Sequence, residues 1–181
     1  MKKLEHIKTL ANAFDVQRKV HRHVCLSVTF KDQISPHPLY WRLDDPKFNL
    51  IEIGIEPYTG QLLSFTVANY NGRISPLESV AESYSRPSND GIPCFNTDLW
   101  QTDRDADDVS ANFYDVPGRC RILLGVQRLR VELFPDQISY NLKTDHFVCE
   151  FNEAKELCAI SVTNLTPNEV NKLMQSIGTD T

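Results

Sequence analysis

Residues 49–70, NLIEIGIEPYTGQLLSFTVANY, form the clearest structural pattern in this 181-residue sequence. Apolar residues recur at alternate positions on both sides of the short segment EPYTG, as they do in strands that bury one face. Within that segment Pro57 has its φ fixed near about −65°, and Gly60 can adopt a positive φ without strain. The pattern predicts a β-hairpin, and therefore a chain that folds largely through antiparallel strand pairing.

The second half of the chain repeats this pattern at residues 147–164, FVCEFNEAKELCAISVTN. When Ser64–Val67 is aligned with Ala159–Val162, both segments end two residues later at an asparagine. The second turn has no residue that matches Gly60. The sequence predicts a second hairpin, and it leaves open whether the two hairpins share an origin or are alike by chance.

Other segments also have the alternation of strands. Strands are predicted within residues 23–30, 121–126, 128–134 and 138–142. By contrast, the segment SPHPLYWRLDDPKF at residues 35–48 contains three prolines, and we expect it to be an irregular connection.

A short amphipathic helix is predicted over residues 2–14, because apolar residues recur there every three or four positions. These residues are Leu4, Ile7, Ala11 and Phe14.

A second helix is predicted at the C-terminal end. Thr166 and Glu169 have the spacing of a capping box, and Pro167 stands at the first helical position. The predicted apolar stripe consists of Val170, Leu173, Met174 and Ile177, and Gly178 is expected to end the helix.

Together these elements predict an α+β fold: a mainly antiparallel sheet built from hairpins, with an N-terminal and a C-terminal helix packed on it. The length of the chain is that of a single domain, residues 1–181. A long polar segment at about residues 86–118 is expected to be an acidic insertion in that domain.

The five cysteines are scattered, and no C-x-x-C pair occurs. Three of them lie within apolar, strand-like runs, where a thiol behaves as a small hydrophobic side chain. This usage suits a reducing compartment, and we find neither a signal-peptide pattern nor an apolar run of about 20 residues that would span a membrane. We therefore expect a cytoplasmic protein that does not contact a membrane.

The charge of the chain is unevenly distributed. Residues 88–115 contain seven acidic residues and one basic residue, whereas the remainder contains 17 and 18. All of the excess behind the net charge of -5 thus lies in one central segment. Six of the acidic residues fall within TDLWQTDRDADDVSANFYD at residues 97–115, and three large aromatic residues stand among them.

Crowded like charges destabilise an ordered surface unless a cationic partner relieves them, and exposed aromatic rings are typical anchors at protein interfaces. The segment therefore suggests a binding surface for a basic protein partner. The proposed charge contacts are Asp98, Asp103, Asp105, Asp107, Asp108 and Asp115, and the proposed anchors are Trp100, Phe113 and Tyr114.

Two structural alternatives remain open for the acidic segment. It could be an ordinary solvated loop, in which residues 105–115 form a helical turn with acids at its N-terminal end. It could also pair internally with the arginines that follow it, which are Arg119, Arg121, Arg128 and Arg130.

Other functional classes are less well supported by the sequence. The alternation of Asp103, Asp105 and Asp107 resembles a calcium loop, but an EF-hand needs glycine where Asp108 stands and glutamate where Tyr114 stands. No nucleophile motif, phosphate loop or metal-ligand spacing indicates an enzyme, a cofactor or a metal, and a nucleic-acid platform needs more positive charge. A small enzyme or metal-binding protein that uses the aspartates, or an adaptor module, is the alternative.

Two segments resemble the immunity proteins of bacterial polymorphic toxin systems, including those of contact-dependent growth inhibition. They are residues 40–72, with a Thr-Gly turn and an S-F-T-V strand, and residues 133–174, with a strand followed by a Thr-Pro-x-Glu helix start. Together they cover somewhat under half of the chain.

The resemblance implies a cytosolic, non-enzymatic protein that binds one cognate toxin C-terminal domain, often a nuclease, and blocks its active site. A nuclease cleft is commonly basic because it binds a polyanion, and carboxylates can occupy positions meant for phosphates. The acidic segment would then plug the toxin's cleft.

Overall fold

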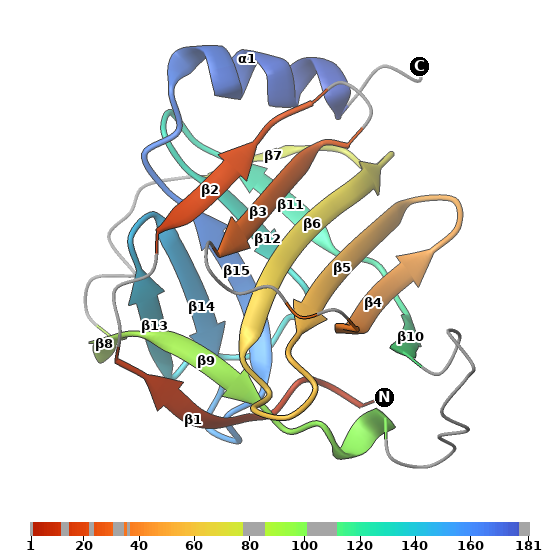
Figure 1. The fold of residues 1–181 in the computed structure, drawn as a ribbon. Helices are drawn as coiled ribbons and strands as arrows, with labels where there is room; N and C mark the ends of the chain where they lie inside the picture. The colour runs from red at the N-terminus through yellow and green to blue at the C-terminus, as the bar shows by residue number, and fades with distance from the viewer. Residues whose placement is uncertain are drawn as a thin grey trace.

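The computed structural model describes residues 2–11, 15–21, 24–30, 35, 37–77, 86–100 and 112–177. These residues form mostly β-strands, with one α-helix, α1 (Pro167–Ser176), and a short 3-10 turn, η2 (Asp98–Trp100) (Figure 1).

The first large sheet has six strands in the order β10-β4-β5-β6-β3-β2. Its strands are β2 (Val16–Lys19), β3 (Leu26–Phe30), β4 (Leu39–Asp45), β5 (Asn49–Ile55), β6 (Leu62–Tyr70) and β10 (Phe113–Pro117). All neighbours are antiparallel except β10, which pairs with β4 in parallel.

The second large sheet has seven strands in the order β7-β11-β12-β15-β14-β13-β8. Its strands are β7 (Ser75–Pro76), β8 (Ser88–Asp90), β11 (Arg121–Leu124), β12 (Leu129–Glu132), β13 (Tyr140–Thr144), β14 (Phe147–Phe151) and β15 (Leu157–Val162). The outermost strands are parallel to their neighbours: β7 pairs with β11, and β8 pairs with β13. The five strands between them pair antiparallel.

A third, two-stranded sheet pairs β1 (His6–Leu10) with β9 (Ile92–Phe95), and it lies at the end of the molecule opposite α1 (Figure 1). The hairpin predicted at residues 49–70 is confirmed as β5 and β6, and that at residues 147–164 as β14 and β15.

Both large sheets contain the same five-strand arrangement. In each, a hairpin is followed by a three-stranded meander whose last strand returns to the hairpin, giving β4-β5-β6-β3-β2 and β13-β14-β15-β12-β11. The register agrees at equivalent points: Leu26–Val67–Ile51 in the first sheet and Leu129–Val162–Phe147 in the second. The likeness between the two hairpins in sequence is thus part of a five-strand repeat.

The two hairpin turns meet the same requirement with different residues. Gly60 has a φ of 72°, and Lys155 takes the matching position with a φ of 61°. The carbonyl of Gly60 accepts a hydrogen bond from Phe95 N (2.7 Å), and that of Lys155 accepts one from His6 N (2.8 Å). The small sheet therefore joins the tips of the two hairpins, and a left-handed residue is needed at each junction.

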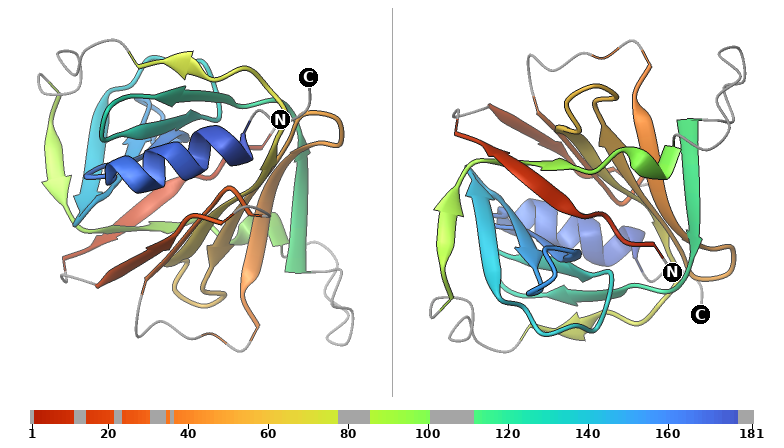
Figure 2. Two further views of the ribbon diagram at one scale, coloured as in Figure 1. Left: turned by 90° about the horizontal axis from the view of Figure 1, so that it is seen from above. Right: turned by 90° about the horizontal axis from the view of Figure 1, so that it is seen from below.

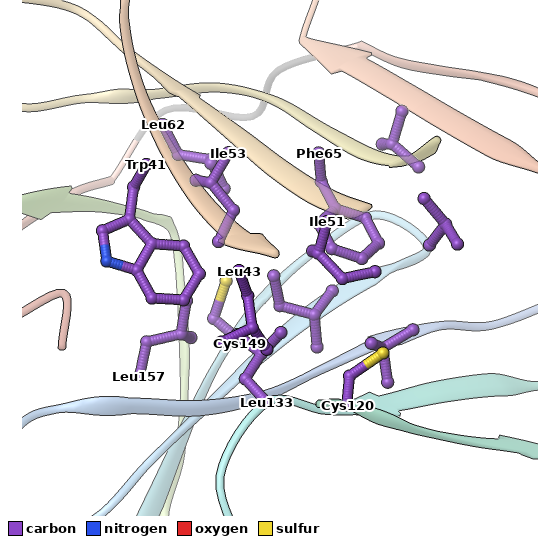
Figure 3. Close-up of a cluster of buried hydrophobic side chains, with 14 of the residues drawn as sticks. Trp41, Leu43, Ile51, Ile53, Leu62, Phe65, Cys120, Leu133, Cys149 and Leu157 are labelled. Carbon is purple, nitrogen blue, oxygen red and sulfur yellow. The ribbon is translucent and has the colours of Figure 1, made fainter. Parts of the chain in front are cut away.

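The core lies between the two large sheets, and one cluster of buried side chains contains residues from both (Figure 3). The labelled members are Trp41, Leu43, Ile51, Ile53, Leu62 and Phe65 from the first sheet, and Cys120, Leu133, Cys149 and Leu157 from the second sheet and its flanks. Each fully buried aliphatic side chain contributes about 1.5–3 kcal/mol, so the face-to-face packing is the main source of stability.

The helix predicted over residues 2–14 is wrong, since His6–Leu10 is a strand. Ile7, expected on the apolar face of a helix, is 57 % exposed, whereas Leu4 is buried in the core. β9 offers a pairing partner more than 80 residues away, and that pairing overrides the local periodicity. The part of the prediction at residues 12–14 lies outside the described residues.

The C-terminal helix is confirmed. Thr166 caps it by accepting a hydrogen bond from Glu169 N, and the Glu169 carboxylate accepts one from Thr166 N, which completes the capping box. Leu173 is buried, but Met174 is 59 % exposed and does not belong to the apolar stripe. Gly178, predicted to end the helix, lies outside the described residues.

Two further expectations are corrected. Residues 39–45, predicted to be irregular, form β4, whose Leu39, Trp41 and Leu43 are buried at alternate positions. The segment at about residues 86–118 is also more than an insertion, because it supplies β8, β9 and β10, one strand to each sheet. Within it, Phe113–Pro117 is a strand, so that end of the acidic segment does not form the helical turn.

Candidate partner-binding surface

β10 forms one edge of the six-stranded sheet, beside β4. The parallel register places Phe113 opposite Tyr40 and Asp115 opposite Arg42. These four side chains lie on the outer face of the sheet, because Trp41 and the other core-facing residues of β4 alternate with them.

The side chains on this edge contact one another closely. The rings of Tyr40 and Phe113 are stacked, with centroids 5.3 Å apart and planes 15° from parallel. The Arg42 guanidinium lies 4.3 Å from the centroid of the Phe113 ring and donates two hydrogen bonds to Asp115, from Nε (2.6 Å) and from Nη2 (2.8 Å). A bidentate pair beside a ring fixes the arginine in one geometry.

Glu52 on β5 lies next to this group, one strand further into the sheet and opposite Arg42. Burial raises the pKa of the Glu52 carboxyl, and the positive charge of Arg42 opposes that rise. Burial also raises the pKa of Tyr40, and the Glu52 charge adds to the effect. We call Tyr40, Arg42, Glu52, Phe113 and Asp115 the edge patch.

Residues 101–111, called the acidic loop below, lie outside the described residues, and the described residues on either side of them are Trp100 and Asn112. Trp100, directly before it, is 4 % exposed, and its indole Nε1 donates a hydrogen bond to the carbonyl of Asn112 (3.1 Å), directly after it. The Trp100 ring also meets the Tyr114 ring edge to face, with centroids 5.9 Å apart. The two ends of the acidic loop are thus held together at the β10 edge.

The structure places the residues predicted for partner binding in different roles. Asp98 is exposed at the start of η2. Trp100 was expected to be an exposed anchor, and this is corrected: the ring is buried because it clamps the base of the loop. Phe113 and Tyr114 are partly buried, and Asp115 is paired with Arg42. Asp103, Asp105, Asp107 and Asp108 lie outside the described residues.

Each of the four arginines that follow the acidic segment pairs with a carboxylate elsewhere. Arg119 pairs with Asp45 (2.8 Å), and Arg121 pairs with Glu132 (3.1 Å). Arg128 and Arg130 both pair with Glu150, at 3.3 Å and 2.9 Å. The internal pairing of Asp115 comes instead from Arg42, which sequence reasoning did not consider.

Little within the described residues indicates catalysis or metal binding. They contain no group of three or more metal-ligating side chains. All five cysteines are buried, and burial raises the pKa of Cys120 and Cys158 to about 12, which disfavours a reactive thiolate. No helix among them has the length and apolar character needed to cross a membrane.

Sequence reasoning missed Tyr40, Arg42 and Glu52. The first two stand in the segment that its prolines marked as irregular, although the alternation of Leu39, Trp41 and Leu43 was a usable sign of a strand. No local pattern could have shown that β10 pairs with β4, 73 residues away.

The chain matches no protein-family model, and no curated protein matches its sequence.

Proposed function

We propose that this protein is an immunity protein, which binds one toxin domain through the acidic loop and the edge patch and thereby blocks a basic active-site cleft. The observation that carries the proposal is the clamp at the base of the loop. Trp100 donates a hydrogen bond to Asn112, so the residues on either side of the segment that carries the four aspartates are fixed relative to each other. Clustered acids on a fixed base are suited to steering and filling a basic cleft.

The edge patch supplies the second requirement of a tight interface, which is preorganised contact area. Arg42 is already held by Asp115 and by the Phe113 ring, so little side-chain entropy is lost when a partner covers it. Tyrosine, phenylalanine and arginine are also the residue types enriched in interface cores. In this proposal the aromatic anchors are Phe113 and Tyr40, while Trp100 supports the loop from within the protein.

A steric and electrostatic mechanism requires no catalytic group. The aspartates of the loop would occupy positions that the toxin uses for substrate phosphates, and the edge patch would cover the rim of the cleft. The toxin is then inhibited for as long as the complex lasts, so a slow dissociation rate determines protection.

The test is co-expression with the toxin domain encoded next to this protein, scored by bacterial growth and by co-purification. We expect growth to be rescued by the wild-type chain and lost with D103N/D105N/D107N/D108N. The double variant D90N/E153Q, which removes two exposed carboxylates from the seven-stranded sheet, one on β8 and one in the turn between β14 and β15, is the control and should still protect. Continued killing in the presence of soluble wild-type chain would refute the proposal.

A further inference from the structure

A polar pocket lies on the outer face of the seven-stranded sheet, at the edge formed by β8 and β13. Its volume is about 330 Å³, and its lining includes Arg86, Ser88, Arg128, Asn141, Lys143 and Asn164. Asn141 and Lys143 point away from the core, because Leu142 between them belongs to the core cluster. β8 and β10 lie on opposite sides of the molecule (Figures 1 and 2), so the pocket is separate from the edge patch.

The described lining of the pocket carries more positive than negative charge. Three residues are cationic and one, Asp145, is acidic, with its carboxylate 3.1 Å from His146 Nε2. Within the described part of the chain, Arg86 and Lys143 form no ion pair. Arg128 is paired with Glu150, so Arg86 and Lys143 are the two lining cations expected to attract an anion to this concave site.

Arg128, which lines this pocket, is held in place by hydrogen bonds. Its Nη2 donates hydrogen bonds to Glu150 (3.3 Å) and to the Ser161 hydroxyl (2.9 Å), and Glu150 itself is 2 % exposed. A guanidinium fixed by buried partners is a preorganised binding group, unlike a flexible surface lysine.

Asn141 provides an independent indication of a ligand. The residue is 5 % exposed and lines the pocket, and its Oδ1 accepts no hydrogen bond from any described residue. Buried polar atoms are nearly always paired, so an unpaired amide oxygen in a cationic pocket indicates a missing hydrogen-bond donor. A ligand that suits both features is an anion that also carries a hydroxyl group.

We propose that this pocket binds a small hydroxyl-bearing anion of the phosphate class, such as hydrogenphosphate or a phosphate monoester of a polyol. The volume suits a molecule of that size and not a folded partner. Arg86 and Lys143 contact the anionic oxygens, Arg128 fixes their position, and Asn141 Oδ1 accepts a hydrogen bond from the hydroxyl group.

The test uses isothermal titration calorimetry of the full chain with inorganic phosphate and with sulfate at pH 7.5. At that pH phosphate still carries a hydroxyl group and sulfate carries none, although both are divalent anions of similar shape. We expect phosphate to bind in the millimolar range or tighter, and sulfate to bind about fivefold more weakly because Asn141 then lacks its donor.

Three variants sharpen the result. R86Q and K143Q should each weaken phosphate binding roughly tenfold, whereas K47Q, the same change at an exposed turn of the other sheet, should leave it unchanged. N141L should abolish the preference for phosphate over sulfate, with its melting temperature checked to show that it is folded.

Absence of phosphate binding would overturn the proposal, as would equal losses in K143Q and K47Q. Binding of an oligonucleotide without binding of phosphate would also overturn it, and would assign the cations to a nucleic-acid surface. None of these results bears on toxin binding, because the proposed toxin-binding surface at β10 lies on the opposite side of the molecule (Figures 1 and 2).

Discussion

The two large sheets end in edges that have the same backbone arrangement and different chemistry. β10 adds in parallel to β4, and β8 adds in parallel to β13, while β4 and β13 occupy the same place in the five-strand repeat. The facing pairs are Phe113–Tyr40 and Asp115–Arg42 at the first edge, and Ser88–Asn141 and Asp90–Lys143 at the second.

At the first edge, stacked rings and a bidentate ion pair fill the outer face, and Trp100 and Asn112, which flank the acidic loop, are joined by a hydrogen bond. At the second edge, small polar residues replace the rings and leave a cationic pocket. In the two proposals above, equivalent places in the repeat carry a protein-binding surface in one sheet and an anion site in the other, because the side chains at equivalent positions differ.

The largest expected effect concerns Glu150. Its equivalent in the first sheet is Gly54, because Glu150 pairs with Asn141 and Gly54 pairs with Tyr40, at the same place in the repeat. Glu150 is 2 % exposed and accepts hydrogen bonds from Arg128, Arg130 and Ser161. Glu150→Ala leaves the partly buried Arg128 without its carboxylate partner and leaves Arg130 with Glu132 alone, and should cost about 3–4 kcal/mol of unfolding free energy.

Urea denaturation measures this cost, and Glu153→Ala, at an exposed turn of the same sheet, is the control that should change little. A loss below about 1 kcal/mol in Glu150→Ala would mean that the outer face of the second sheet is as tolerant as that of the first.

The next effect tests the clamp at the first edge. Trp100→Ala removes a buried ring, its hydrogen bond to Asn112 and its contact with Tyr114, and should cost about 3 kcal/mol of stability. It should also reduce toxin affinity more than its effect on stability explains, because the loop loses its fixed base. Retention of full affinity by the folded fraction would separate the clamp from binding.

A third effect concerns an asymmetry between the halves, since β15 is followed by α1 whereas β6 is followed by β7. Arg18 on β2 donates a hydrogen bond to Glu169 (2.7 Å) and so ties α1 to the first sheet. Burial would raise the pKa of Glu169, but Arg18 and Thr166 outweigh it and lower the pKa to about 2.

Glu169→Gln should therefore cost about 1–2 kcal/mol at pH 7, after allowance for solvent screening. Because the folded pKa is below the unfolded one, the contribution is present above about pH 4.5 and is lost as the pH falls toward about 2. Unfolding free energies of both proteins across that range measure it, and a difference that is independent of pH would contradict the ion pair.

The smallest expected effect is a gain in unfolding free energy, whereas the preceding ones are losses. Burial raises the pKa of Glu52, so the folded state binds this proton more tightly than the unfolded state and ionisation weakens the fold. Glu52→Gln should stabilise the protein by less than about 1 kcal/mol at pH 7, with no difference at pH values below the unfolded pKa. Thermal denaturation at several pH values checks it, and a destabilised variant would show that Arg42 offsets the burial fully.

Local features of the fold could be predicted from the sequence, because their causes are local. The hairpin with Pro57 and Gly60 and the helix capped by Thr166 each depend on residues a few positions apart. The helix expected near Ile7 failed because β9, a distant segment, provides a strand partner, and β4 was missed because flanking prolines concealed its alternation.

The sites were less predictable for the same reason. The acidic segment stood out by charge alone, but the burial of Trp100 and the pairing of Asp115 with Arg42 depend on β10 joining β4. The cationic pocket combines residues from β13 with Arg86 and Arg128, which are far apart in the chain. Only the assembled sheets bring these groups together.

The central claim is that the acidic loop, held at the first edge, steers and fills a basic cleft. Its most direct test is the association rate with the toxin domain as a function of salt, for wild type, D103N/D105N and the control D90N/E153Q, since both variants remove two negative charges. We expect D103N/D105N to associate about tenfold more slowly at low salt and with a flatter salt dependence, and the control to match wild type within about twofold. Equal association rates for the two variants at every salt concentration would contradict the claim.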